Sequence, residues 1–232
     1  MSPDLTVPMS DSTLQAFGPL TCSTAAISKN EVHKLEKLTK GGKTKRLLYE
    51  CAIELFQEKG YDKVSVDEIV KKAGMAKGTF YIYFESKAAI ITQMLQEYDD
   101  YYSTVAAQME PNTPASERLE LIVRSSCQFT KESIGVDLLR ALYMEQLLPG
   151  RSEQDALNSN RALYRIIHEL LVEGQQSGIY RTDFDINKMG AWLIRCIRGT
   201  FYEWCIQEGR FDLCDECVQF VHAFFCGLEW PH

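Results

Sequence analysis

The stretch from Val66 to Lys87 constrains the fold of this chain more than any other segment. It reads VDEIVKKAGMAKGTFYIYFESK. Ser65 and Glu68 have the spacing of a capping box, which begins a short helix, and Gly74 can end that helix in the left-handed conformation. A second short helix is expected over residues 77–84. Two short helices joined by a tight turn predict a helix-turn-helix.

The charge distribution is compatible with DNA binding, although the formal net charge of −7 argues against it at first. Phosphate contacts need cations. Residues 43–90 carry nine Lys and Arg against seven Asp and Glu, whereas residues 91–232 carry 12 against 21. A mildly basic head followed by an acidic body is expected if only the head meets DNA.

Apolar residues at spacings of three and four predict helices along the rest of the chain. One helix should begin at Thr44 and end at Gly60, and Ser86 should cap a helix that continues to residue 109. Thr113 and Pro114 read as an N-cap and a first helical residue. Further helices are expected over residues 135–148, 152–177, 185–208 and 212–229. Because no alternating stretch is long enough for a sheet, the predicted fold is all-α, with a three-helix helix-turn-helix domain before a larger helical bundle.

Composition shifts divide the chain into three expected parts. Residues 1–42 should form a flexible tail, residues 43–90 the helix-turn-helix domain, and residues 91–232 a helical domain for ligand binding and dimerisation. The lysine-rich end of the tail suits either an arm along a DNA groove or a solvated linker. The sequence has no run of eighteen apolar residues and no secretory pattern at its start, so we expect a cytoplasmic protein without a membrane partner.

The second helix of the motif suits entry into a major groove, because its first residues are small or polar. Tyrosine hydroxyls can bond phosphates, and helix N-termini add backbone N–H donors. Phe80 and Phe84 lie four residues apart and should pack inward. The expected DNA-contacting residues are Thr44, Arg46, Ser65, Val66, Ala76, Lys77, Gly78, Thr79, Tyr81, Tyr83 and Lys87.

The segment from Thr44 to Leu95, which contains KGTFYIYFESK, closely resembles the N-terminal domain of TetR-family transcriptional regulators. The resemblance implies a homodimeric repressor whose third helix reads a palindromic operator on double-stranded DNA. It also implies a C-terminal domain that binds a small-molecule effector and then spreads the two DNA-binding heads.

The chain departs from the family pattern at two places. A serine or similar polar residue is usual where this chain has Met75 or Ala76, and a second aromatic residue or a histidine is usual where it has Ile82 or Tyr83. Direct base contacts are therefore expected to be few, with Lys77 and Thr79 as the best candidates.

Helical spacing alone suggests which residues of the body bind the effector and which contact the second subunit of the dimer. The expected effector-binding residues are Phe129, Leu139, Tyr143, Ile167, Trp192 and Arg195. Arg195 and Arg198 lie in an apolar helix and need a partner, either an acidic ligand or a nearby glutamate. The expected dimer-interface residues, on the last two helices, are Phe201, Trp204, Val218, Val221 and Phe225.

Cys214, Cys217, His222 and Cys226 form the only group with a metal-like composition. The five-residue step between Cys217 and His222 turns the two pairs apart on a helix, so packing is favoured over metal binding or redox sensing. We predict no metal, no cofactor and no catalytic residues, because the chain has neither a Ser–His–Asp ordering nor a glycine-rich phosphate loop. The alternative to a ligand-responsive repressor is a protein-interaction or metal- and redox-sensing module with a vestigial DNA-binding head.

Overall fold

A computed structural model of the chain describes residues 40–148 and 158–227. These residues form helices and the turns between them, with no β-strand, as the all-α prediction requires. The helices are α2 (Lys40–Lys59), η1 (Tyr61–Lys63), α3 (Val66–Ala73), α4 (Lys77–Tyr83), α5 (Lys87–Ala107), α6 (Ala115–Phe129), η2 (Thr130–Ile134), α7 (Gly135–Leu147), α9 (Ala162–Gln176), α10 (Ile186–Ile206) and α11 (Leu213–Cys226). Most of the expected tail lies outside the described residues, as do the start of the helix expected over 152–177 and the end of the one expected over 212–229.

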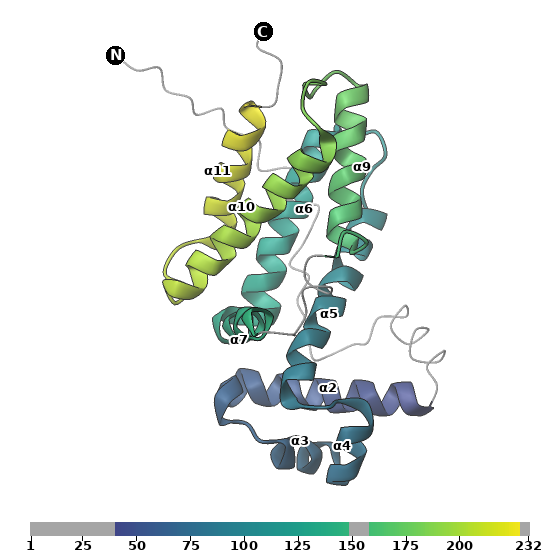
Figure 1. Cartoon of the computed structure of the whole chain (residues 1–232), viewed down its shortest axis with the longest axis vertical. Helices are drawn as coiled ribbons and strands as arrows, with labels where there is room; N and C mark the ends of the chain where they lie inside the picture. The colour runs from purple at the N-terminus through teal and green to yellow at the C-terminus, as the bar shows by residue number, and fades with distance from the viewer. Residues whose placement is uncertain (1–39, 149–157, 228–232) are drawn as a thin grey trace. The chain divides into compact units, whose positions relative to one another are not determined.

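The head consists of α2, η1, α3 and α4, and the long helix α5 leads from it into the body (Figure 1). Apolar residues from each main helix meet in its core, where Phe56, Ile69 and Phe80 are at most 1% exposed. Phe84 is also buried, as its spacing from Phe80 predicts. The expected domain boundary at residue 90 falls inside α5, so the head and the body share one continuous helix.

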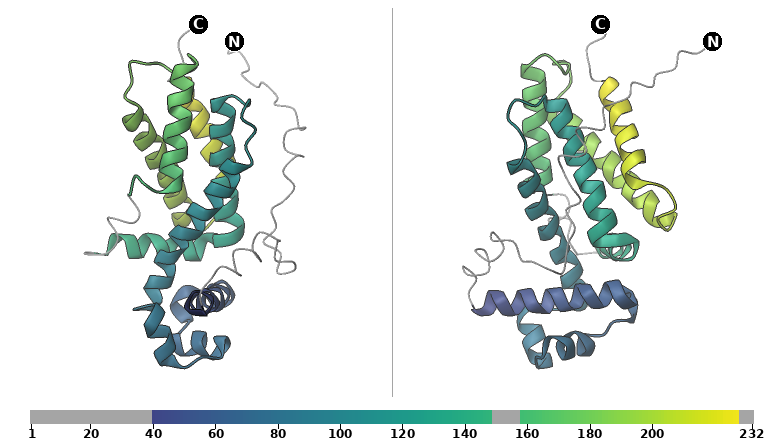
Figure 2. Two further views of the ribbon diagram at one scale, coloured as in Figure 1. Left: turned by 90° about the vertical axis from the view of Figure 1, so that its right-hand side faces the viewer. Right: turned by 180° about the vertical axis from the view of Figure 1, so that it is seen from behind.

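The body is a bundle in which α5, α6, α7, α9, α10 and α11 pack around a common core. Helix α10 contacts α7, α9 and α11, while α11 also packs along α6. Figure 2 shows α10 and α11 together on one side of the bundle and α5 and α9 on the other. None of the described helices combines the length and the apolar character that crossing a bilayer requires.

Three predicted helix boundaries were wrong. Helix α2 begins at Lys40 rather than Thr44, although two glycines follow Lys40. Pro114 is the N-cap of α6, whose first residue is Ala115, so Thr113 does not cap it. Residues 158–161 form a turn, and α9 begins only at Ala162, because Asp99 of α5 accepts a hydrogen bond from the Ala162 N–H at 3.2 Å. This capping hydrogen bond comes from a distant part of the chain, so the sequence around Ala162 does not predict it.

The sequence also missed the link between α6 and α7. The chain does not leave the helical path after Phe129 but passes through η2, one turn of π-helix, directly into α7. Gly135, at φ 77°, makes the change of direction at the end of η2. Such π-helical turns are rare and often occur at functional sites.

Gly174 permits the close approach of α9 to the segment that follows it. A Cβ atom at this position would overlap two ring carbons of Tyr180, which is fully buried and stacks on Phe225 with ring centroids 5.2 Å apart. We therefore expect Gly174→Ala to lower the free energy of unfolding by about 1–3 kcal/mol, a typical cost of overpacking. Urea denaturation followed by circular dichroism measures this change.

Gly199 provides the matched control, because it lies within α10 and a Cβ there would meet nothing within 4 Å. Gly199→Ala should leave the stability unchanged or raise it by up to about 1 kcal/mol, as alanine favours helix. Equal effects of the two substitutions would contradict the steric argument at Gly174.

Candidate DNA-binding site and effector cavity

The turn between α3 and α4 is built by local hydrogen bonds. Ser65 and Glu68 form the predicted capping box, in which the Ser65 N–H donates to the Glu68 carboxylate at 2.9 Å and the Ser65 hydroxyl accepts from the Glu68 N–H at 3.3 Å. The ammonium group of Lys59 and both donors of Ser65 lower the pKa of Glu68 to about 2, so the box keeps its charge. Gly74 then ends α3 at φ 66°. These contacts fix where α4 begins.

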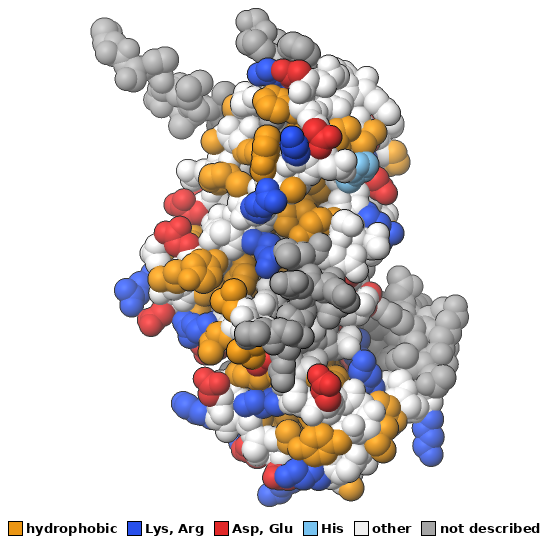
Figure 3. Space-filling view, in the orientation of Figure 1, with side chains coloured by type: hydrophobic (Ala, Val, Ile, Leu, Met, Phe, Trp, Pro, Cys, Tyr) orange, Lys and Arg blue, Asp and Glu red, His pale blue; other side chains and the backbone are white. Residues whose placement is uncertain are grey.

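Helix α4 presents one continuous face to solvent while Phe80 anchors the opposite face. Lys77, Gly78, Tyr81 and Ile82 are exposed, with Tyr81 at 52% and Ile82 at 76%. In Figure 3, basic and hydrophobic side chains lie together over the end of the molecule to which α3 and α4 belong. Ile82 was not among the predicted contacts. Its position four residues after Gly78, on the face opposite Phe80, is the signal that would have found it.

Lys77 is held in place by an acidic residue of the preceding helix. Its ammonium group lies 2.9 Å from the Asp67 carboxylate, which raises the pKa of Lys77. Both side chains are about half exposed or more, so the pair is open to solvent. A phosphate that approached Lys77 would have to compete with Asp67 for the same ammonium group.

Two predicted cations do not belong to this outward face. The Lys87 ammonium donates to the carbonyl oxygens of Tyr61 and Val64, at 2.7 and 3.0 Å, and lies over the Tyr61 ring. Arg46 pairs with Glu50 of its own helix and with Glu97 of α5. The predicted phosphate contacts of Lys87 and Arg46 stay predictions, and a phosphate would have to compete with these partners for both charges.

The remaining predicted DNA contacts differ in exposure. Ala76, the N-cap of α4, is exposed, whereas Thr79 and Tyr83 are half-buried. Ser65 is exposed but its hydroxyl serves the capping box, and Val66 packs partly against the core. The Thr44 hydroxyl donates to the Lys40 carbonyl within α2 at 3.1 Å. The outward face of α4 is thus the part of the predicted set that is exposed together.

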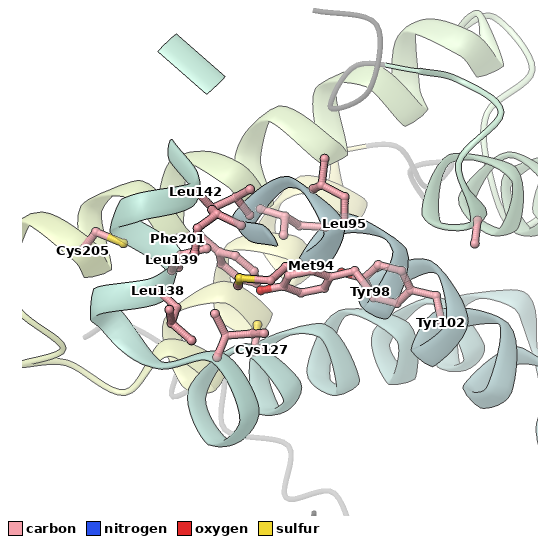
Figure 4. Close-up of a cluster of buried hydrophobic side chains, with 14 of the residues drawn as sticks. Met94, Leu95, Tyr98, Tyr102, Cys127, Leu138, Leu139, Leu142, Phe201 and Cys205 are labelled. Atoms are coloured by element: carbon pink, nitrogen blue, oxygen red, sulfur yellow. The ribbon is translucent and has the colours of Figure 1, made fainter. Parts of the chain in front are cut away.

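A cavity of about 80 Å³ lies among α5, α6, α7, α9 and α10. Figure 4 shows several of its apolar side chains, from Leu95 and Tyr98 of α5 to Phe201 of α10. The lining residues are Leu95, Tyr98, Tyr102, Ser126, Leu139, Leu142, Tyr143, Gln146, Arg161, Leu163, Tyr164, Ile194, Ile197, Arg198 and Phe201. Typical ligand pockets measure about 300–1,000 Å³. The cavity is therefore small in this conformation.

Two of the six predicted effector-binding residues line the cavity. Leu139 and Tyr143 line the cavity, whereas Phe129, Ile167, Trp192 and Arg195 do not. Trp192 and Arg195 are exposed, because the turn of α10 directs them outward. The arginine at the cavity is Arg198, three residues farther along α10, and a second guanidinium comes from Arg161.

Hydrogen bonds occupy the polar groups around the cavity. The Tyr98 hydroxyl lies 2.9 Å from the Thr130 hydroxyl of η2, and the Tyr102 hydroxyl lies 2.7 Å from that of Ser126. Arg198 donates to the Gln146 side chain at 2.9 Å. Arg161 pairs with Asp99 of α5 at 3.1 Å. Burial raises the pKa of both cavity tyrosines of α5, so their phenols stay protonated.

The predicted dimer residues are buried within a single chain. Phe201, Trp204, Val218, Val221 and Phe225 are all at most 8% exposed, and Phe201 lines the cavity. Residues already covered by their own chain cannot supply a new contact surface, so the prediction named the wrong face of each helix. The exposed apolar side chains of α10 and α11 are instead Trp192, Tyr202, Ile206 and Phe220, at 38–62%.

The cysteines and the histidine of the last helix differ in exposure. His222 and Cys226 are exposed, and the His222 ring bonds Glu120 of α6 at 2.9 Å. Cys217 is buried and Cys214 is half-buried. Within residues 40–148 and 158–227, no group of three or more His, Cys, Asp or Glu side chains is arranged to hold a metal ion.

Comparison with known proteins identifies the head. The sequence profile of bacterial regulatory proteins of the tetR family matches residues 48–94. The fatty acid metabolism regulator protein of Bacillus subtilis (strain 168) is 25% identical over 168 residues, which cover 72% of this chain and 86% of that protein. The HTH-type transcriptional repressor DhaR of Mycobacterium sp. (strain GP1) is 26% identical over 191 residues, or 78% of this chain and 90% of the repressor.

Solved structures share the fold over most of the chain. The TetR-family repressor FadR of Thermus thermophilus, in complex with lauroyl-CoA, has a TM-score of 0.63 at 24% identity and matches 81% of this chain and 96% of its own. FadR from Bacillus subtilis, in complex with stearoyl-CoA, has a TM-score of 0.66 at 21% identity, with coverage of 79% and 99%. The profile match over residues 48–94 shows that the head is of the tetR-family type, and along most of its length the chain is similar to transcriptional regulators of that family.

Proposed function

We propose that this chain is a homodimeric repressor that binds a palindromic operator through α4 and leaves it when an effector enters the body. The observation that carries the proposal is the outward face of α4. There Lys77, Gly78, Tyr81 and Ile82 are exposed together on a helix whose other face is buried. A small residue allows close backbone approach, Tyr81 suits a phosphate, and an apolar side chain such as Ile82 suits a thymine methyl group.

Dimerisation is proposed because a palindromic operator requires a two-fold protein. The apolar side chains exposed on α10 and α11, among them Tyr202, Ile206 and Phe220, would form its interface. Large exposed apolar groups on neighbouring helices are typical of subunit interfaces. Light scattering on the purified protein tests this directly. The mass of a single chain, 26.5 kDa, at micromolar concentration would contradict the proposal.

The lining of the cavity indicates the chemistry of the effector. Its walls are mostly apolar, and an acidic group could replace the present partners of its two arginines, which are Asp99 for Arg161 and Gln146 for Arg198. An apolar chain with an anionic end fits this combination. The two FadR structures contain acyl-CoA thioesters, which have both parts, so we propose acyl-CoA as the first class of effector to test.

The size of the cavity indicates how the effector would act. A volume of about 80 Å³ cannot hold a long acyl chain, so the effector can enter only if the surrounding helices separate. Helix α5 lines the cavity through Leu95, Tyr98 and Tyr102 and continues into the head. Separation of α5 from α9 and α10 would therefore move α4 relative to the α4 helix of the second subunit. An effector that prefers the open body shifts the protein away from the DNA-bound state.

Fluorescence anisotropy with labelled DNA from the regulator's own promoter tests the function. We expect tight binding that weakens steeply with salt, and a loss of at least tenfold in Tyr81→Ala. Lauroyl-CoA should then release the DNA. If no DNA is bound from that promoter or from a random-sequence selection at low salt, the repressor proposal is wrong. Binding that lauroyl-CoA and stearoyl-CoA leave unchanged would contradict only the effector class.

Release of Lys77 from its acidic partner should strengthen operator binding. Asp67→Asn removes the ion pair and one negative charge beside the proposed phosphate path. Because exposed ion pairs are weak, we expect the operator Kd to fall by only roughly twofold to fivefold and its salt dependence to steepen. Asp62→Asn is the control, since Asp62 is also exposed in the head but lies in η1. An unchanged or weaker affinity in Asp67→Asn would show that Lys77 does not meet the DNA.

A further inference from the structure

Two pairs of buried hydroxyl groups lie where α5 packs against α6 and η2, beside the effector cavity. The Tyr98 hydroxyl lies 2.9 Å from that of Thr130, and the Tyr102 hydroxyl lies 2.7 Å from that of Ser126. In Figure 4 both tyrosines extend from α5 into this cluster. Ser126 and Thr130 are fully buried, and the tyrosines are at most 5% exposed. Each buried hydroxyl proton therefore needs an acceptor.

Both protons of the Tyr98–Thr130 pair have acceptors. Thr130 donates its one hydroxyl proton to the Ser126 carbonyl oxygen at 2.8 Å. In its contact with Tyr98 it can only accept, so Tyr98 is the donor there. This pair has no proton left for a ligand.

The Tyr102–Ser126 pair has a proton to spare. Each residue carries one hydroxyl proton, and the single hydrogen bond between them uses one of the two. Within residues 40–148 and 158–227, neither hydroxyl has a second hydrogen-bond partner. Both residues line the cavity, so the remaining proton is available to a group that enters it. A buried donor that gains an acceptor recovers the free energy that its desolvation costs.

We propose that the Tyr102–Ser126 pair donates its spare proton to the carbonyl oxygen of an acyl thioester and so selects the acyl group of the effector. The inference rests on the proposed function, because acyl-CoA must first enter the cavity. A thioester carbonyl accepts a hydrogen bond but has no proton to donate, which matches a site with one free donor. Tyr143, another tyrosine of the cavity, already donates to the Arg198 carbonyl at 3.0 Å.

The pair would stay assembled when the effector enters. It joins α5 to α6, whereas the opening proposed above separates α5 from α9 and α10. The donor is thus held on the part of the bundle that does not come apart. Sites in which buried polar groups are positioned for one substrate group discriminate strongly against analogues that lack that group.

The experiment compares two ligands that differ only at the carbonyl. Calorimetric titration of the purified full-length protein, without DNA, gives the Kd of lauroyl-CoA and that of S-dodecyl-CoA, the thioether that lacks the carbonyl oxygen. We expect the wild type to bind the thioester about tenfold more tightly, since the thioether leaves the buried proton unpaired. This comparison tests the proposal without any substitution.

Two variants assign the preference to the pair. The double substitution Tyr102→Phe with Ser126→Ala removes both hydroxyls, and replacing both partners by apolar groups of similar shape is nearly neutral for stability. Its two Kd values should become about equal, while its melting temperature stays close to that of the wild type. Tyr98→Phe is the matched control, one turn earlier on the same helix and also in the cavity wall. Because the Tyr98 proton is already used, this variant should keep the tenfold preference.

The outcomes separate this inference from the proposed function. Equal binding of the two ligands by the wild type overturns the carbonyl contact alone and leaves acyl-CoA as the effector. A tenfold preference that persists in the double variant, or that Tyr98→Phe abolishes as completely, also overturns it. If neither ligand binds, the proposed effector class fails together with this inference.

Discussion

Ile82→Glu should reduce operator affinity by about a hundredfold while leaving the fold intact. Ile82 lies on the outward face of α4 and is 76% exposed, so a polar side chain there disturbs no core contact. On DNA the glutamate would lose the apolar contact of isoleucine and bring a negative charge to the phosphates. A lost base contact costs about 1–3 kcal/mol, and roughly 2.7 kcal/mol corresponds to a hundredfold change in Kd. Anisotropy titration of operator DNA measures the effect.

Leu147→Glu is the matched control for this prediction. Leu147 is 78% exposed, nearly the same as Ile82, but it lies at the end of α7 in the body. The substitution adds the same charge to the protein, so any general repulsion from DNA will appear in both variants. We expect Leu147→Glu to change the operator Kd by less than about threefold. Equal losses in both variants would show that α4 does not face the DNA.

The head could be predicted from sequence because its signals are local. Ser65 and Glu68 are three residues apart, Gly74 directly ends the helix that they begin, and Phe80 and Phe84 share one helical face. Each of these contacts joins residues within one or two helical turns. The sequence pattern that predicts it can therefore be recognised without knowledge of the fold. Local spacing also placed Lys77, Gly78 and Tyr81 on one helix, and their contacts with DNA remain a prediction.

The errors concern contacts between residues that are distant in the chain. The partners of the Lys87 ammonium could not be predicted, because the carbonyl groups that bind it come from a segment more than twenty residues earlier. Phe201 faces the cavity because α10 packs against α7 and α9, and helical spacing alone cannot say which apolar face turns inward.

Gln57→Ala should weaken the effect of the effector on DNA binding without altering DNA binding itself. The π-helical segment η2 connects the cavity to the head through side chains. At one end the buried Thr130 hydroxyl bonds Tyr98, which lines the cavity, and at the other the Ser133 carbonyl accepts a hydrogen bond from Gln57 of α2 at 2.8 Å. If an effector displaces Tyr98, η2 shifts, and Gln57 carries that shift to the head.

Because Gln57 is exposed, its loss should not affect stability, and the operator Kd without effector should match that of the wild type. Coupling between two sites is typically about 1–3 kcal/mol, or a 5- to 150-fold change in affinity. We expect Gln57→Ala to reduce the ratio of operator Kd values with and without a saturating acyl-CoA by at least about fivefold. Gln96→Ala is the control, since the Gln96 side chain is exposed and bonds Asp100 within its own helix, α5. An undiminished ratio in Gln57→Ala would mean that the signal passes through α5 alone.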